Sequence, residues 1–198
     1  MAKVRDAVHW DAKYAATDRL WSATPNVTVA EVVEPLPAGR ALDVGAGEGR
    51  HAVWLAARGW RVTAVDFSPV GIERGRAGAV ETGADVDWVV ADVLDWAPRP
   101  GTVFDLVLVA FIHLPDDVLA RARRWLAPGG RLVVVGHDLR NLTDGVGGPK
   151  NPALLHTEDE HRRTAEGLAV ERLGEVLRET PEGTAIDRVL VARAPEEP

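Results

Sequence analysis

The sequence contains no cysteine among its 198 residues. This absence excludes a disulfide framework, a zinc site built from thiolates and a cysteine nucleophile. The sequence also lacks a long apolar run: the longest, residues 103–112, is interrupted by Asp105 and falls short of the roughly 20 residues of a membrane-spanning helix. Residues 1–11 lack the apolar stretch of a signal peptide. We therefore expect a cytoplasmic protein with no membrane partner.

Positive charge is scarce and dispersed, with 23 Lys and Arg against 30 Asp and Glu and a formal net charge of -7. A protein that binds duplex nucleic acid usually carries a clustered basic face. The local run of Arg121, Arg123 and Arg124 has the spacing of an exposed helix face, so we expect no nucleic-acid partner. Because 46% of the residues are hydrophobic, a chain of this length can bury a core, and we expect residues 1–198 to fold as one domain. We expect this domain to be a monomer or a weak homodimer.

From residue 40 onward, short apolar runs alternate with helical stretches. This alternation predicts an α/β fold in which helices cover both faces of a doubly wound, mostly parallel sheet. Ser68 and Pro69 are suited to begin a helix after the second strand, and residues 128–130 predict a turn before the fifth. The expected strands of this part are residues 40–44, 61–65, 86–90, 104–109 and 131–135.

The remainder of the chain follows a different pattern. Residues 137–152 are rich in Gly, Asn, Asp and Pro and predict a long loop. Residues 157–193 predict a helix, begun by a capping box of Thr157 and Glu160, and an antiparallel hairpin. At the other end, Trp10 and Tyr14 share one helix face, and Thr28 with Glu31 predicts a second capping box. We expect residues 1–35 to form a helical lid over the carboxyl edge of the sheet.

A cluster of His156, His161, Glu158 and Asp159 raises the question of a metal site. A spacing of five between the histidines does not align two ligands on one helix face, as a spacing of four would. We therefore expect a solvated, polar helix start and no metal site.

The strongest motif is the run Leu-Asp-Val-Gly-Ala-Gly-Glu-Gly at residues 42–49. It follows a strand and opens a helix, so its glycines permit a tight turn and the close approach of a ligand to the backbone. Two cofactor classes use such a loop. Arg50 stands where a dinucleotide-binding loop has its third glycine, and the acidic Asp43 and Glu48 suit a cationic ligand better than a pyrophosphate.

The pattern D-x-G-x-G-x-G after the first strand is similar to motif I of the class I S-adenosylmethionine-dependent methyltransferases. The resemblance extends over residues 40–138, the expected cofactor-binding core. Residues 45–51, followed by Trp54-Leu55-Ala56, resemble small bacterial members near the tellurite-resistance and thiopurine methyltransferases. The resemblance implies a Rossmann-like seven-stranded sheet of order 3-2-1-4-5-7-6 with strand 7 antiparallel. It also implies S-adenosylmethionine as cofactor, S-adenosylhomocysteine as product and transfer of a methyl group to a small molecule by in-line displacement.

Site residues follow from the resemblance and from their places at the carboxyl ends of strands. Asp66 is where an acid would accept hydrogen bonds from the ribose hydroxyls, Phe67 would lie against the adenine, and Asp92 would accept from its amino group. Ala110 would meet the methionine part through its backbone. The expected cofactor-binding residues are Asp43, Gly45, Ala46, Gly47, Gly49, Asp66, Phe67, Asp92, Val93 and Ala110.

Candidates for catalysis are less specific. His113, after the fourth strand, and His137, at the end of the fifth, are candidates for a general base or a substrate contact. Trp21, Asn26 and Arg50 are candidates for the acceptor side. Two alternatives stay open: a catalytically silent adenosylmethionine-binding module, and an NAD-type oxidoreductase, against which Arg50 argues.

Overall fold

The computed structural model describes residues 7–114 and 116–196 of the chain. These residues divide into two compact units, one from residues up to 26 and 37–100, the other from residues 27–36 and from 101 onward. Strands of the described residues form a seven-stranded sheet of order β3-β2-β1-β4-β5-β7-β6, in which β7 runs antiparallel to β5 and β6. The predicted α/β class and strand order are confirmed, whereas the single domain remains a prediction.

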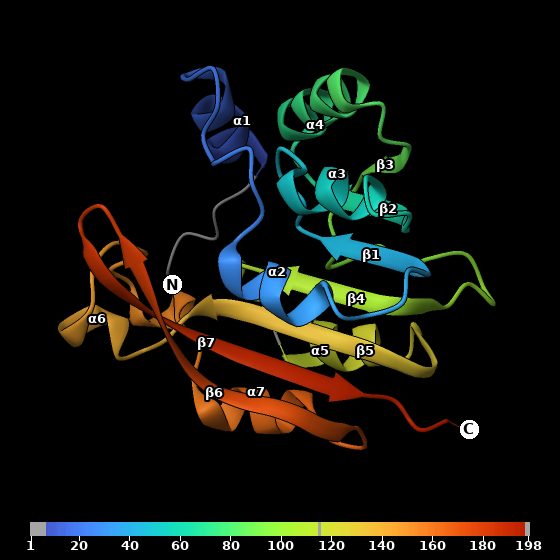
Figure 1. Cartoon of the computed structure of the whole chain (residues 1–198). Helices are drawn as coiled ribbons and strands as arrows, with labels where there is room; N and C mark the ends of the chain where they lie inside the picture. Colours follow the sequence, from blue (N-terminus) through green and yellow to red (C-terminus); the bar gives the residue numbers. More distant parts are fainter. Residues whose placement is uncertain (1–6, 115, 197–198) are drawn as a thin grey trace. The chain divides into compact units, whose positions relative to one another are not determined.

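The first unit contains β1 (Arg40–Val44), α3 (Arg50–Ala56), β2 (Arg61–Asp66), α4 (Pro69–Thr82) and β3 (Val86–Val90), together with α1 (Ala7–Ala15). β1 pairs in parallel with β2, and β2 with β3. α4 begins as predicted, because the Ser68 hydroxyl accepts a hydrogen bond of 3.0 Å from the Gly71 N–H and Pro69 occupies the first turn. α1 packs against α4 (Figure 1).

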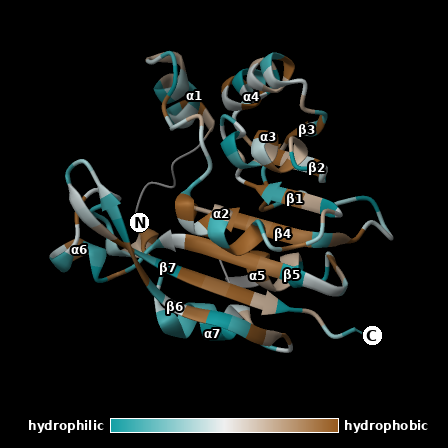
Figure 2. Ribbon diagram, viewed as in Figure 1, coloured by the Kyte–Doolittle hydropathy of each residue, from teal (hydrophilic) through white to brown (hydrophobic). Residues whose placement is uncertain are grey.

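The second unit contains α2 (Val27–Val33), β4 (Phe104–Ala110), α5 (Asp116–Arg123), β5 (Leu126–His137), α6 (Asn141–Asp144), the 3-10 helix η1 (Pro152–Leu154), α7 (Glu158–Thr164), β6 (Ala169–Thr180) and β7 (Gly183–Arg193). β4 is buried along almost its whole length, as its nearly continuous apolar sequence predicts. Figure 2 shows β4 and β5 as largely hydrophobic and α7 as largely hydrophilic. The predicted hairpin is confirmed by the antiparallel pairing of β6 with β7.

Two expectations about the second unit were wrong. β5 begins at Leu126 rather than at Arg131, so residues 128–130 lie inside an irregular strand and not in a turn before it. The register with β4 shifts here, since Phe104 pairs with Leu126 but Leu106 with Arg131, and this shift accommodates the extra residues. The predicted loop at 137–152 carries the last residue of β5 and α6, and η1 begins at its end.

The second predicted capping box was also wrong. α2 begins at Val27, which places Thr28 inside the helix instead of before it. Val29 and Val33 are completely buried, so α2 belongs to the core of the second unit. A lid can therefore come only from the part of the N-terminal segment before α2. Within the described ranges, no helix has the length and apolar character needed to cross a membrane.

Candidate functional site

The glycine loop joins β1 to α3 in the first unit. Gly45, Gly47 and Gly49 have φ angles of 70°, 56° and 73°, a left-handed conformation that favours glycine. The backbone N–H groups of Gly45 and Ala46 donate to the carbonyl of Val65 at 2.8 and 3.1 Å, which ties the loop to β2. The loop is therefore a defined turn at the carboxyl end of β1.

At two of these positions, neighbouring side chains also leave no room for a Cβ atom. A Cβ at Gly47 would lie 2.5 Å from the phenolic oxygen of Tyr14, and one at Gly49 would lie 2.2 Å from the ring of Trp88. Gly49 thus allows Trp88 of β3 to pack against the start of α3, which is a packing role. Gly47 instead faces a polar atom of α1, the helix that covers the loop.

Asp66 lies at the end of β2, where its two carboxylate oxygens accept hydrogen bonds of 2.8 Å from the N–H groups of Gly47 and Ser68. Burial raises the pKa of this carboxyl, while the two backbone donors lower it. Asp66 therefore holds the glycine loop in shape. A carboxylate has about four lone-pair sites, so acceptor capacity remains for ribose hydroxyls.

Asp43 is a buried acid two residues before the loop, with 1% of its surface exposed. One of its oxygens, Oδ2, is buried and has no hydrogen-bond donor among the described residues. Burial raises the pKa of Asp43 to about 7, against the effect of the Arg50 charge. A buried acceptor without a donor is costly, and this oxygen suits a cationic or N–H-bearing ligand such as adenosylmethionine.

The remaining expected cofactor residues are placed less distinctively. Asp92 is exposed, and its Oδ1 accepts a hydrogen bond of 2.9 Å from the Leu94 N–H, the arrangement of a turn residue. Phe67 is half-buried beside Asp66, and Val93 is buried. Ala110 belongs to the second unit, at the carboxyl end of β4.

Glu48 was expected to suit a cationic ligand, but the sequence reasoning did not predict its contacts with the N-terminal segment. Its carboxylate accepts the backbone N–H groups of Leu20 and Trp21, each at 3.0 Å from Oε2, and forms a 3.0 Å ion pair with Arg74. Asp11 and Tyr14 of α1 were also missed. Asp11 accepts a 2.5 Å hydrogen bond from the Ser68 hydroxyl. The sequence signal for these contacts was Glu48, an acidic residue inside the glycine loop. The sequence does not show which residues Glu48 contacts.

The predicted acceptor-side residues Trp21, Asn26 and Arg50 lie in the first unit. The Asn26 N–H donates to Nε2 of His51 at 3.3 Å, and an Arg50 Nη1 donates to the Ser22 hydroxyl at 3.4 Å. His51 is 5% exposed and packs in the interior of the first unit. Trp21 is 43% exposed, with its ring centroid 6.3 Å from that of Trp10.

His137 ends β5 in the second unit, and its Nδ1 lies 3.0 Å from Oδ1 of Asp187. Asp187 is completely buried and accepts a 2.6 Å hydrogen bond from Nε of Arg178. The His137 and Phe111 rings meet edge to face at 5.2 Å. Phe111 has a φ of 59°, a conformation that is strained for a non-glycine residue. An imidazole beside a buried carboxylate is an arrangement that a general base can use.

The second candidate histidine, His113, lies against a group that was expected to be solvated. His156 and His161 are 4% and 1% exposed, so the prediction of a solvated helix start was wrong for the two histidines. Glu158 and Asp159 are exposed, as predicted. α7 begins only at Glu158, and a helical spacing therefore does not apply between the two histidines. The extended chain before the helix turns His156 toward both His161 and His113, with ring centroids 5.1 and 5.2 Å apart.

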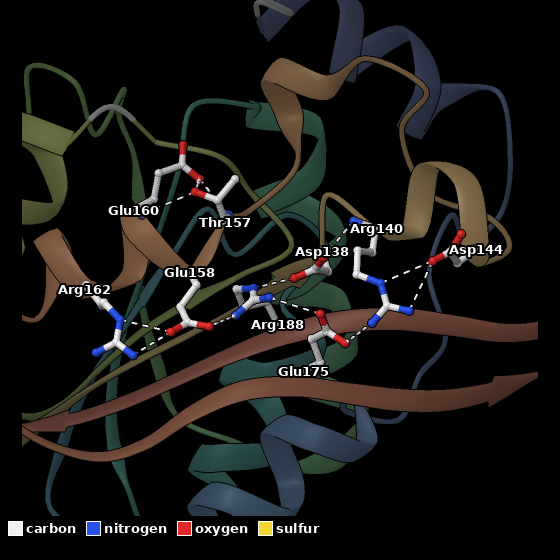
Figure 3. A network of polar contacts seen from close by, with 9 residues as sticks. All are labelled: Asp138, Arg140, Asp144, Thr157, Glu158, Glu160, Arg162, Glu175 and Arg188. Atoms are coloured by element: carbon white, nitrogen blue, oxygen red, sulfur yellow. Dashed lines mark hydrogen bonds and ion pairs between the residues drawn. The ribbon is translucent and has the colours of Figure 1, made fainter.

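A separate cavity of about 400 Å³ lies in the second unit, lined among others by Arg140, Glu158, Glu175 and Arg188. Figure 3 shows that these charges pair with one another: Arg188 contacts Asp138, Glu175 and Glu158, and Arg140 contacts Glu175 and Asp144. Because its lining charges are compensated, the cavity presents no strong field for an ionic ligand.

Comparison with known proteins agrees with the glycine loop and the sheet. Residues 41–130 match the family model described as a methyltransferase domain. A ubiquinone biosynthesis O-methyltransferase of Xylella fastidiosa is 35% identical over 104 residues, 50% of this chain and 42% of that protein. A demethylmenaquinone methyltransferase of Clavibacter sepedonicus is 37% identical over 122 residues, 59% of this chain and 47% of that protein. The chain thus spans less than half the length of these curated relatives.

The fold itself is shared with solved structures. The N-methyltransferase NodS from Bradyrhizobium japonicum WM9, solved in complex with S-adenosyl-l-homocysteine, superposes with a TM-score of 0.73 at 18% identity. The superposition covers 96% of this chain and 100% of NodS. The resemblance to the tellurite-resistance group stays a prediction. In its sheet order, its glycine loop and the match over residues 41–130, the chain is similar to the class I S-adenosylmethionine-dependent methyltransferases.

Proposed function

We propose that this protein transfers a methyl group from S-adenosylmethionine to a small-molecule acceptor. The observation that carries the proposal is the pairing of a positive-φ glycine loop with the buried Asp43, whose Oδ2 has no donor among the described residues. An acid at this place favours a ligand with an ammonium group and a sulfonium, and disfavours a pyrophosphate.

The residues of the first unit would share the binding of this cofactor. Asp66 would accept from the ribose hydroxyls while its backbone contacts keep Gly47 in place. Charge-assisted bonds of this kind contribute about 1.5–3 kcal/mol each. S-adenosylmethionine supplies an activated methyl group, so the chain's own task is to align the acceptor and to exclude water.

An oxygen acceptor gives His137 a defined task. A neutral hydroxyl is a weak nucleophile, and a base that takes its proton raises its reactivity. The Nδ1 of His137 faces the buried Asp187 at 3.0 Å, which would stabilise the imidazolium formed when Nε2 accepts the proton. The curated relatives include an enzyme named as an O-methyltransferase, so hydroxyl acceptors are the first class to test.

The test uses the full chain in two steps. Calorimetry with S-adenosylhomocysteine measures cofactor binding for the parent and for Asp43→Asn, with the exposed Asp85→Asn as control. A panel of hydroxyl, thiol and amine acceptors then follows, with release of adenosylhomocysteine as the readout. Binding without release on any acceptor would favour the silent binding module. Absence of binding, together with binding of NADH, would favour the oxidoreductase and overturn the proposal.

The proposal includes a small molecule as the partner, a monomer or weak homodimer as the functional form and the cytoplasm as the location. The size of the chain in solution, measured by light scattering with and without adenosylhomocysteine, tests the oligomeric part. A stable dimer at micromolar concentration would contradict it.

A further inference from the structure

Three segments of the second unit bring ligand-type side chains together. His113 follows β4, His156 precedes α7, and Glu160 lies in the first turn of α7. One ring nitrogen of each histidine and one carboxylate oxygen of Glu160 lie within 4.8 Å of one another. Nε2 of His113 is 3.7 Å from Oε1 of Glu160. This group belongs to neither the glycine loop nor the pair of His137 and Asp187.

The histidines of this group are shielded from solvent. His156 is 4% exposed, and His113 is half-buried. Nδ1 of His113 is buried and has no hydrogen-bond partner among the described residues. A buried polar atom without a partner is rare in folded proteins and calls for an explanation.

Neighbouring groups hold two of the ligands in place. Oε2 of Glu160 accepts hydrogen bonds from the N–H and hydroxyl of Thr157, at 2.8 and 2.9 Å, and this capping box is visible in Figure 3. The other oxygen of Glu160 is left on the side of His113. The ring of His156 makes a hydrogen bond to the backbone of Ile112, and its Nδ1 lies 3.3 Å from Nε2 of His161. A hydrogen bond from one ring nitrogen to a backbone carbonyl orients the imidazole of a metal ligand in known metal sites.

We propose that His113, His156 and Glu160 bind one divalent transition metal ion of the zinc type. Two imidazoles and one carboxylate form a donor set that zinc uses, and the fourth position of such a site stays open to water or to an oxygen of a small molecule. Ligand atoms around tetrahedral zinc lie roughly 3.4 Å apart, so the three ligand atoms, which lie within 4.8 Å of one another, would move closer together when the metal binds.

The experiment measures metal binding directly and does not depend on methyl transfer. A chelator first removes any bound metal from the full chain, and the chelator is then removed. The metal-free chain is titrated with Co²⁺, whose visible absorption reports its coordination number. Zn²⁺ is then added to displace it. The expected result is one Co²⁺ per chain, with the intense absorption of a four- or five-coordinate site, and displacement by one equivalent of Zn²⁺.

Variants assign the site. Glu160→Gln is the decisive one because glutamine also serves in a capping box, so the helix start is retained while the anionic ligand is lost. His113→Gln removes a second, half-buried ligand. Each should weaken Co²⁺ binding on the order of 100-fold or more, since even outer contacts are worth 10- to 100-fold. Glu158→Gln, in the same turn, and His9→Gln, in α1, should bind as the parent does.

Two results would overturn the proposal. One is the absence of saturable Co²⁺ binding to the folded parent chain. The other is binding that Glu160→Gln and His113→Gln leave unchanged, which would place the metal elsewhere on this acidic protein. Neither result touches the proposed methyl transfer, because no cofactor or acceptor is present in the titration.

Discussion

The phenolic oxygen of Tyr14 lies where a side chain on Gly47 would begin, 2.5 Å from the position of its Cβ. Tyr14 is 4% exposed, and burial raises the pKa of its hydroxyl above the usual range. The middle of the glycine loop is therefore covered by a neutral phenol from α1. Any ligand that approaches the backbone of Gly47 shares this space with Tyr14.

Gly47→Val should abolish measurable binding of adenosylhomocysteine while the chain still folds. A branched side chain at a φ of 56° is strained and blocks the approach of a ligand to the loop. Calorimetry measures the affinity, and circular dichroism checks the fold. The matched control is Gly78→Ala in α4, where a Cβ meets no atom within 4 Å; it should raise stability by about 1 kcal/mol without changing affinity. A folded Gly47→Val that binds like the parent would contradict the expectation.

Asp66→Ala should weaken binding of adenosylhomocysteine by about 2 kcal/mol, roughly thirtyfold, because hydrogen bonds to the ribose are lost. The structure adds a second cause, since the variant also loses the acceptor that fixes the N–H of Gly47. Asp85→Ala, on the exposed surface before β3, is the control and should bind within twofold of the parent. If Asp66→Ala also binds within twofold, the acid serves the loop and the helix start alone.

The titration of Asp43 gives a prediction about stability. Burial raises its pKa in the folded chain to about 7, whereas an aspartate in an unfolded chain titrates near about 4. Between these pH values the folded state binds more protons than the unfolded state. The contribution of Asp43 to the free energy of unfolding therefore decreases as the pH rises from about 4 to about 7. Asp43→Asn removes this contribution.

Urea denaturation at several pH values between about 4 and about 7 measures the effect. The variant should lose less stability with rising pH than the parent does, and the two curves should differ most at the upper end. Asp85→Asn provides the reference for an exposed acid. Parallel curves for parent and Asp43→Asn would show that the carboxyl ionises at an ordinary pH in the folded protein.

The strands were predictable because they are short, mostly apolar runs, and the order of the sheet followed from the family resemblance. Residues 40–44, 86–90 and 104–109 were placed to within one residue of β1, β3 and β4. The beginning of β5 was not, since Pro128, Gly129 and Gly130 are typical of a turn. Only pairing with β4 shows that the strand continues through a register shift at this point.

The loop of the candidate site was predictable from its motif, but the partners of its residues were not. Gly49 is required by Trp88, which is distant in sequence and reaches α3 only through the packing of β3. The histidine cluster was missed because a helical spacing was applied to His156, which lies before the first residue of α7. Local patterns predict elements, whereas these contacts arise from the tertiary fold.

His137→Asn should lower turnover of a hydroxyl acceptor by about 100-fold or more, the usual contribution of a general base, and leave adenosylhomocysteine affinity unchanged. The reason is the position of His137 against the buried Asp187. Asp85→Asn, on the exposed surface before β3, is the control. Turnover equal to the parent's would remove His137 from the reaction.

The last prediction concerns residues 7–26, which cover the glycine loop within the first unit. Three contacts anchor this segment: Asp11 to Ser68, the N–H groups of Leu20 and Trp21 to Glu48, and the carbonyl of Thr17 to Arg74. All three partners lie on or next to the loop and α4, so a cofactor that orders the loop should also order the segment. We expect hydrogen exchange in residues 7–26 to slow when adenosylhomocysteine binds.

Deleting residues 1–24 should lower turnover far more than it lowers cofactor affinity, because a cover over the loop acts on solvent exclusion and alignment. Glu48→Ala is the milder variant, since it releases the segment from the loop without removing α1. α2 is the internal reference: its buried Val29 and Val33 predict slow exchange with or without ligand. If residues 7–26 already exchange as slowly as α2 in the free protein and do not change on binding, the segment is a fixed structural layer, and it does not act as a lid.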